Sequence, residues 1–409
     1  MIKALWKRLS ESSFLIFGLT LVLNGLGLIA LYSIGTYEGS SFMQNAFYKQ
    51  LLFMIPALVA FFIALFIPRR LIHKYSYLLF GIMLLFIAIP YFGPSVAGTH
   101  RWINMGLPVG IQPSEFAKWI LVITLARYLS DHTLEMHHFS SILFPIFLAL
   151  VPFVIVFKQP DLGTALILFV PVFPMLYWVG ARPFHLFLFL APLLSILTAF
   201  HTVSFSIWAT VLLIILVLAK PTIFMAVVTY FSNIFLGLLA PVLWNLLRPY
   251  QKNRILTLIN PDLDPLGAAY QIIQSKTAIG SGGFWGKGLG QGTQTHLKFL
   301  PVQESDFIVS VIGEELGFIA IAFMLVLFTL LIIKIINLAT NSNDRFSGLI
   351  IFGIGSIFLA HVFVNCAMSV GLIPVKGLPL PFISYGGSFL VSCYIMIGLV
   401  MNLGVNRPD

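Results

Sequence analysis

Two ionisable residues stand three positions apart at the start of an apolar segment. Glu115 and Lys118 belong to the run Gln112-Pro-Ser-Glu-Phe-Ala-Lys, in which Pro113 suits the first turn of a helix. Their spacing places both side chains on one helix face. Charged groups in such a segment are costly and face the protein interior or a wet cavity. The pair is therefore either a structural ion pair or part of a polar cavity, and the sequence leaves both open.

Three further charged residues lie beside apolar segments. Arg101 carries a planar guanidinium that can bind phosphate, although it could instead form an Arg–Trp anchor with Trp102 at a membrane edge. Asp161 is placed to cap the helix that follows it, and it could also orient a nearby cation. Lys376 opens a Pro- and Gly-interrupted segment, and broken segments at membrane depth tend to line cavities.

The segment 247–306 is the longest polar stretch of the chain, and chemistry is most expected there. Asp264, followed by Pro265 and Gly267, is typical of a turn. A carboxylate at a membrane surface could instead accept a proton from a hydroxyl. Eight residues after this stretch, Glu314 falls inside a predicted span and should face protein or water.

Glycines crowd the middle of this polar stretch and suggest a nucleotide-binding loop. The spacing excludes a Walker A motif, because Ser281 stands where its first Gly is required and Gly288 where Ser or Thr is required. A flexible or tightly turned surface loop is the better interpretation, with Phe284 and Trp285 at the membrane interface.

The composition defines the elements that must position these residues. The 409 residues are 59% hydrophobic and 9% charged, which excludes a soluble globular protein. Continuous apolar runs of about 20 residues predict membrane-spanning helices. We expect one all-α polytopic membrane domain, 1–409, with about twelve spans. The predicted spans are 13–34, 49–67, 75–93, 113–130, 142–157, 162–180, 184–200, 205–219, 222–246, 307–334, 347–371 and 384–404.

The distribution of Lys and Arg predicts the orientation. With both termini in the cytoplasm, twelve of the 23 basic residues lie on the cytoplasmic side, as the positive-inside rule requires. The segment 247–306 is then an extracytoplasmic loop, on the same face as Arg101 and Lys376. The net charge of +9 reflects this topology signal, so no nucleic-acid partner is expected. Cys366 and Cys393 both lie in apolar runs, which excludes a disulfide framework.

Taken in order, several motifs resemble the SEDS family of bacterial envelope proteins (shape, elongation, division and sporulation). The motifs are G-T-H-R-W, Q-P-S-E-F-A-K, Q-P-D-L-G-T, D-P-L-G-A-A-Y-Q, S-D-F-I and G-L-P-L-P-F-I-S-Y-G-G-S. Residues 272–283 and 292–294 look like the RodA-type elongation branch more than the division branch. The family has ten spans, so an inserted helix pair is expected between Asp161 and Arg248. Glu304-Ser305 departs from the His-Thr common before Asp306.

The resemblance implies a peptidoglycan glycosyltransferase of the inner (cytoplasmic) membrane. Its substrates would be lipid II and the nascent glycan, and its partner a class B penicillin-binding protein. The family's essential loop aspartate falls on Asp264, the candidate base. A further set would form the polar cavity and bind the lipid-linked pyrophosphate; by position it comprises Arg101, Gln112, Glu115, Lys118, Asp161 and Lys376. A divalent cation, Mg or Mn, is expected, with Asp264 and Glu115 as candidate ligands.

The implied reaction agrees with the residue types. An α-linked donor that yields a β-1,4 bond requires inversion, which needs one base and no covalent sugar–enzyme intermediate. Arg101 and Lys118 are suited to the developing charge of the leaving pyrophosphate. A lipid-linked precursor flippase is the main rival, because it also needs ionisable residues between broken helices. The protein could also be a scaffold for the transpeptidase, or a division or sporulation paralogue.

Overall fold

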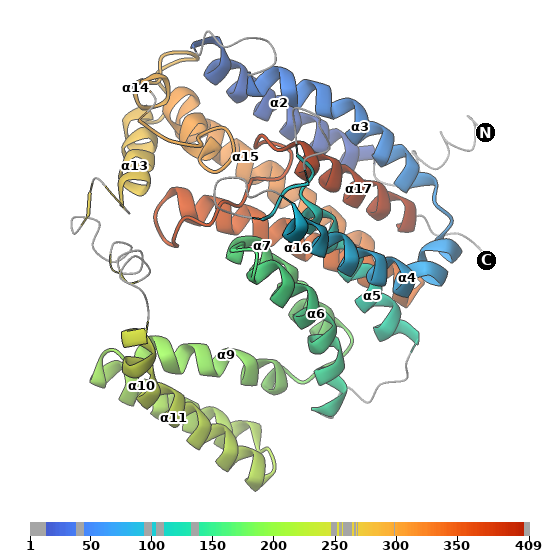
Figure 1. Ribbon diagram of the computed structural model, residues 1–409, viewed down its shortest axis with the longest axis vertical. Coiled ribbons are helices and arrows are strands. Elements are labelled where there is room, and N and C mark those ends of the chain that lie inside the picture. Colours follow the sequence, from blue (N-terminus) through green and yellow to red (C-terminus); the bar gives the residue numbers. More distant parts are fainter. Residues whose placement is uncertain are drawn as a thin grey trace.

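The computed structural model describes residues 14–37, 45–93, 100–103, 110–131, 139–246, 252, 256, 264–265, 267, 269–297 and 299–404. Helices dominate this part of the chain, and a single antiparallel bridge, between Ile103 and Ile111, is its only β-type pairing. Figure 1 shows the helices as a main bundle with a smaller group below it. Arg248 and Asp262 lie outside the described residues.

Thirteen of the described helices follow the predicted apolar runs. In chain order they are α2 (Phe14–Tyr37), α3 (Ala46–Phe66), α4 (Arg69–Ala88), α5 (Pro113–Asp131), α6 (Ser140–Phe157), α7 (Leu162–Phe169), α8 (Val172–Trp178), α9 (Pro183–Thr198), α10 (Thr202–Ala219), α11 (Ile223–Leu246), α15 (Ile308–Thr340), α16 (Arg345–Ser369) and α17 (Gly387–Leu403). Three short helices complete the described set: η1 (Ile89–Phe92), α13 (Tyr270–Gly282) and α14 (Thr293–His296).

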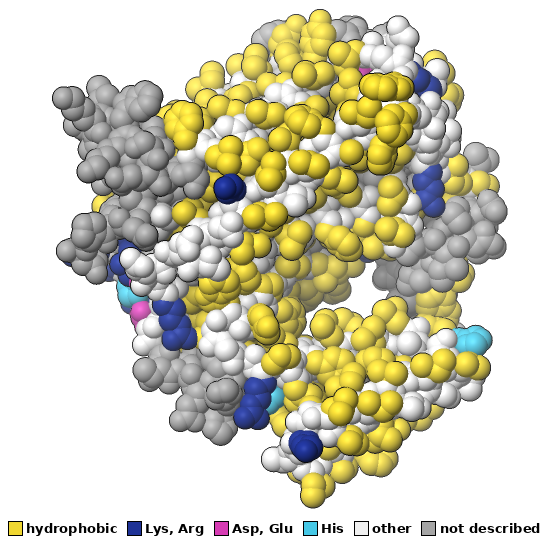
Figure 2. All heavy atoms as spheres, turned by 180° about the vertical axis from the view of Figure 1, so that it is seen from behind, with side chains coloured by type: hydrophobic (Ala, Val, Ile, Leu, Met, Phe, Trp, Pro, Cys, Tyr) yellow, Lys and Arg dark blue, Asp and Glu magenta, His cyan; other side chains and the backbone are white. Residues whose placement is uncertain are grey.

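Eight of the described helices are long and apolar enough to cross a membrane, and three shorter apolar segments accompany them. This confirms the predicted all-α polytopic membrane fold. Each predicted span coincides with a helix, except that 162–180 is broken into α7 and α8. The break falls at Pro171, which lacks the N–H that a continuous helix would use. Figure 2 shows hydrophobic side chains spread widely over the outside of the helices, as expected for helices that face lipid.

The main bundle is held by close helix contacts at small residues. A Cβ on Gly398 of α17 would lie 2.6 Å from the Phe61 carbonyl oxygen of α3, so only glycine allows this approach. Asn402 then donates to the carbonyls of Ala64 and Ile67, at 2.9 and 2.7 Å, and satisfies the end of α3. These contacts join the first and last parts of the chain.

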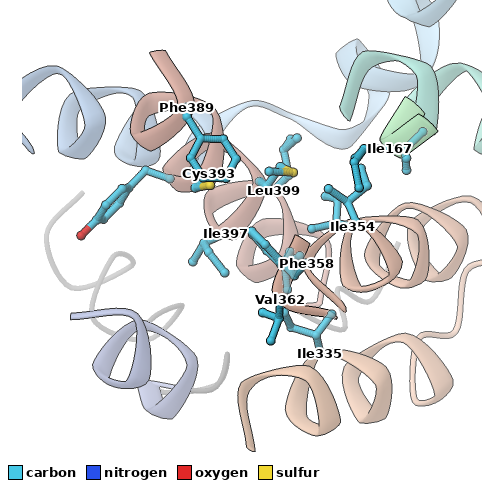
Figure 3. Close-up of a cluster of buried hydrophobic side chains, with 14 of the residues drawn as sticks. Ile167, Ile335, Ile354, Phe358, Val362, Phe389, Cys393, Ile397 and Leu399 are labelled. Atoms are coloured by element: carbon cyan, nitrogen blue, oxygen red, sulfur yellow. The ribbon is translucent and has the colours of Figure 1, made fainter. Parts of the chain in front are cut away.

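The core of the main bundle forms around α16. Phe358 and Val362 of α16 lie between Ile397 of α17 and Ile335 of α15 (Figure 3), and all four side chains are buried. Because α16 is covered on several sides, any polar side chain that it carries inward must find its partner within the protein. That requirement explains the contacts of His361 described below.

The helices α9, α10 and α11, residues Pro183–Leu246, make a separate group that we call the α9–α11 unit (Figure 1). It has its own small core of Ala191, Leu212 and Leu216. A polar network crosses it, in which Trp208 donates to Ser195 and Ser195 donates to Asn233, each at 2.8 Å. Three helices therefore stand between α8 and the long loop, where the inserted helix pair was expected.

Candidate active site

Lys118 lies fully buried between two helices. Its Nζ atom is 2.6 Å from Oε2 of Glu115 on α5 and 3.0 Å from Nε2 of His361 on α16. The ring of Phe389 on α17 faces the ammonium, with its centroid 4.9 Å from Nζ. The predicted position of Glu115 and Lys118 on one helix face is thus confirmed, and the Lys118–His361 contact ties α5 to α16. An ammonium without contact to water needs these partners, because burying an unpaired charge is costly.

His361 is a member of this network that the sequence motifs did not single out. Its Nδ1 lies 3.0 Å from the Pro379 carbonyl oxygen, which can only accept a hydrogen bond, so Nδ1 carries the proton. Nε2 is then the acceptor for the Lys118 ammonium. The rule used for Glu115, that an ionisable residue inside an apolar span is unusual, would have identified His361 as well.

Arg101, Gln112 and Asp161 meet at one end of the main bundle. Gln112 Nε2 donates to Asp161 Oδ2 at 3.0 Å, and Arg101 Nη1 lies 3.9 Å from Asp161 Oδ1. The Arg101 guanidinium also donates to the carbonyl oxygens of Gln159 and Pro160. Its side chain remains 28% exposed, so one edge of a fixed cation is open to a ligand. The structure brings these three predicted residues together.

Asp161 has the capping role that the sequence predicted. Its Oδ1 accepts from the Thr164 backbone N–H at 3.2 Å, at the start of α7. The same carboxylate therefore caps a helix and contacts Gln112 and Arg101. Asp161 therefore caps α7 and also lies beside the Arg101 guanidinium.

Lys376 joins this region through its backbone. A Cβ on Gly163 would lie 2.6 Å from the Lys376 carbonyl oxygen, so the Lys376 segment packs directly on the turn that Asp161 caps. Lys376 N–H donates to Met368 Sδ at 3.1 Å, and its side chain is half-buried. The predicted outer loop thus contacts the predicted anion site.

The segment 304–306 is attached to the same loop. Asn365 donates to the carbonyl oxygens of Asp306 and Leu378, at 3.1 and 2.8 Å. Tyr385 N–H donates to Glu304 O at 2.8 Å, so the residue that departs from the family pattern contributes its backbone. Burial raises the pKa of the Asp306 carboxyl above its usual range, although Ser305 donates to it. Burial outweighs the hydrogen bond here because it penalises the charged form.

Asp264 lies in the predicted turn and is half-buried. Its carbonyl oxygen accepts from Gly267 N–H at 3.3 Å and Ala269 N–H at 3.2 Å, directly before α13. A side chain at Gly267 would collide with both oxygens of the Asp264 carboxylate. Glycine at position 267 therefore leaves room for the Asp264 carboxylate to lie against the turn, and the position of the turn follows that of α13.

Helix α13 is fixed to the bundle by serines. Ser275 Oγ lies 2.6 Å from Ser310 Oγ of α15 and donates to the Ser369 carbonyl of α16, also at 2.6 Å. A Cβ on Gly282 would collide with the Gly313 carbonyl oxygen, so the end of α13 sits directly on α15. These contacts fix α13 and therefore the position at which the Asp264 turn joins it. Direct contact between Asp264 and the Arg101 cluster is not among the described interactions.

The glycine-rich segment forms a tight loop around Glu314. The Glu314 carboxylate is fully buried, as predicted, and accepts from Lys287 Nζ at 2.8 Å and from the backbone N–H groups of Gln294 and Thr295 at 3.0 Å. Within this loop Gly286, Gly288 and Gly290 all adopt positive φ. The lysine and these backbone amides of the loop donate to Glu314 and are not available to a phosphate. This supports the conclusion that the segment is not a nucleotide-binding loop.

The residues expected to hold a metal fit that role only in part. Among the described residues, no three His, Cys, Asp or Glu side chains gather in a way that could hold a metal ion. Glu115 is committed to the Lys118 ammonium and only 2% exposed, which makes it a poor ligand. Mg²⁺ commonly takes one or two carboxylates and completes its shell with water and substrate phosphates. Asp264 therefore fits as a partial ligand.

Known proteins share the sequence and the architecture of this chain. A family model covering FtsW, RodA and SpoVE, described as cell cycle protein, matches residues 13–210 and 201–408. The chain belongs to this family, the SEDS peptidoglycan glycosyltransferases. It is 30% identical to the peptidoglycan glycosyltransferase RodA of Treponema pallidum, over 97% of this chain and 98% of that protein. It is 32% identical to the peptidoglycan glycosyltransferase MrdB of Escherichia coli K12, over 83% and 80%.

A solved structure shares the fold. A chain from a peptidoglycan synthase complex, studied for the coordination of polymerization and crosslinking, superposes with a TM-score of 0.72. The two chains are 25% identical, and the match covers 96% of this chain and 97% of the other. The multi-pass membrane architecture is thus common to the family, while the family model itself spans three paralogues.

Proposed function

We propose that the protein polymerises lipid II into β-1,4-linked glycan strands during cell elongation. The observation that carries the proposal is the cluster of Arg101, Gln112 and Asp161, which presents one open edge of a fixed guanidinium at the end of the bundle. Arg binds pyrophosphate oxygens well because its fork matches their geometry. Arg101 and Lys376 would contact the leaving pyrophosphate, and Lys118 would add positive potential from its buried position.

The proposed reaction is a single displacement. The acceptor hydroxyl oxygen attacks the anomeric carbon of the donor, and the bond from that carbon to the pyrophosphate oxygen breaks. The pyrophosphate leaves with the bonding electron pair, and its charge is met by the Arg101 guanidinium. Asp264 takes the hydroxyl proton. A divalent cation, Mg or Mn, bound by the substrate phosphates and Asp264 would neutralise part of the same charge.

The glycan would be made outside the cytoplasm, with both termini inside. Ion pairs at the end of the main bundle opposite the Arg101 cluster support a site that opens to one face of the membrane only. Arg69 and Asp344 form an ion pair there at 2.5 Å, and Asp131 contacts both His73, at 2.7 Å, and Arg127, at 3.3 Å. A flippase needs a path that opens to both faces, whereas these ion pairs link α4, α5 and the start of α16. The transferase therefore remains the better proposal.

The lipid tails require an apolar route from the bilayer. Figure 2 shows a hollow between the α9–α11 unit and the main bundle, bordered by hydrophobic side chains. We propose that the polyprenyl chain enters there. A class B penicillin-binding protein is the proposed partner, because the superposed chain comes from a complex that couples polymerization to crosslinking.

The test is glycan synthesis by the purified protein from lipid II with Mg²⁺ or Mn²⁺. Asp264→Asn keeps the size of the side chain and removes the base, so we expect the rate to fall by about 10²- to 10⁴-fold. Asp262→Asn, which changes the other acid in the first half of the loop, is the matched control and should keep the wild-type rate. Equal rates for wild type and Asp264→Asn would exclude Asp264 as the base. Absence of glycan with every variant and with wild type would exclude the polymerase itself.

A further inference from the structure

One end of the α9–α11 unit borders a partly open cationic cavity of about 520 Å³. It lies where α9 begins, α10 ends and α11 begins. Arg182, His185 and Lys220 line it together with aromatic and apolar side chains, among them Phe139 and Met225. This is far along the chain from Asp264, and no step of the proposed glycan synthesis uses these residues.

The formal charge carried by the α9–α11 unit itself is of one sign. The sequence from residue 181 to 247 contains no Asp or Glu, so the α9–α11 unit carries basic groups only. The N-termini of α9 and α11, helices of 16 and 24 residues, lie beside the cavity and add the partial positive charge of their dipoles. An anionic group is the ligand that this lining favours.

A second, apolar cavity continues from the first. It has a volume of about 370 Å³, shares Lys220 and Pro221 with the cationic cavity, and runs between α10 and α11. Leu216, Ala226 and Phe231 are among its lining residues. A free phosphate or a nucleotide would use only the cationic cavity. A ligand that fills both must join an anionic group to a hydrocarbon chain.

We propose that the two cavities bind one anionic phospholipid. Its phosphate contacts Arg182 and Lys220, and one acyl chain lies along the apolar cavity between α10 and α11. Basic pockets between transmembrane helices at the cytoplasmic side are known to suit anionic headgroups. In the proposed topology this end of α9–α11 faces the cytoplasm, so the ligand comes from the inner leaflet. The site is independent of lipid II polymerisation, because it involves neither Asp264 nor Arg101.

The test is native mass spectrometry of the full chain in detergent, with phosphatidylglycerol or phosphatidylcholine added. We expect phosphatidylglycerol to bind preferentially. Each of Arg182→Gln and Lys220→Gln should weaken binding about fivefold, and the double variant roughly thirtyfold. Lys334→Gln, an exposed lysine of α15 that lines neither cavity, is the matched control and should leave binding unchanged.

A second measurement on the wild-type chain does not depend on the variants folding. Phosphatidylglycerol with a photoreactive diazirine in one acyl chain should label peptides of α10 and α11 that line the apolar cavity. Retained preference in the double variant, equal binding of phosphatidylcholine, or labelling confined to other helices would each overturn the proposal. Displacement of the lipid by an equal concentration of inorganic phosphate would show a small-anion site and overturn it as well.

Discussion

Removal of the Lys118 ammonium tests whether its buried network is one energetic unit. Lys118→Met keeps the length of the side chain and the contact with Phe389, but leaves the Glu115 carboxylate, 2% exposed, without the ammonium 2.6 Å away. Breaking a buried pair by removing one partner costs about 3–5 kcal/mol. We expect a loss of that size in the free energy of unfolding, measured with denaturant in detergent micelles.

A double variant measures the interaction between Glu115 and Lys118 apart from the contribution of each residue alone. Glu115→Gln with Lys118→Met removes both charges, and replacing both members of a buried pair is often close to neutral. We expect the double variant to be more stable than Lys118→Met alone and its cost to fall about 2 kcal/mol short of the sum of the single losses. Lys334→Met, on the exposed face of α15, should change stability by no more than about 0.5 kcal/mol.

Two outcomes would refute this reasoning. If the losses of the single variants add in the double variant, Glu115 and Lys118 do not act together. If Lys118→Met is as stable as wild type, the ammonium is not needed to compensate Glu115. Polymerisation then distinguishes the two interpretations of the pair: a stable but inactive double variant assigns Lys118 to the reaction, and a stable, active one assigns it to packing.

Two further predictions concern α13 and Asp306. Gly282→Ala should destabilise the protein by about 1–3 kcal/mol, because its Cβ would meet the Gly313 carbonyl, whereas Gly280→Ala on the same helix meets nothing within 4 Å and should stabilise by about 0.4–1 kcal/mol. Denaturant unfolding compares the two, and equal effects would contradict the packing of α13 on α15. The folded-state pKa of Asp306 is raised, so the folded protein holds this proton more tightly and loses stability as pH rises above about 3.8 and through that pKa. Asp306→Asn should therefore gain stability relative to wild type across that window in thermal unfolding at a series of pH values, and a pH-independent difference would contradict it.

The helices could be predicted because lipid permits few kinds of backbone structure. A span must be apolar, about 20 residues long and internally hydrogen-bonded, so the pattern of the chain determines its position. Local chemistry also determined the cap at Asp161 and the turn at Asp264, each of which depends on residues within a few positions. The break between α7 and α8 at Pro171 was missed because a proline inside an apolar run can bend a helix as well as interrupt it.

The spacing of three residues predicted that Glu115 and Lys118 meet, but the more distant partners of the buried charges could not be predicted. His361 lies 243 residues from Lys118, and Lys287 lies 27 residues from Glu314. The sequence shows that such charges need partners, but which one each meets depends on how α5, α15 and α16 pack. The double role of Asp161 was equally hard to predict, since one carboxylate has two oxygens and serves both the helix and the cation.

Helix α16 connects the two halves of the candidate site. His361 holds Lys118 from this helix, and the Ser369 carbonyl of the same helix accepts from Ser275 of α13, the helix that follows Asp264. The two positions are eight residues apart, which corresponds to about 12 Å along the axis. A shift of α16 would therefore change both the surroundings of the Lys118 ammonium and the surface on which α13 packs. This shared attachment gives a physical reason for the proposed base and the buried Lys118 ammonium to keep a fixed relation, although they stand on segments remote in sequence.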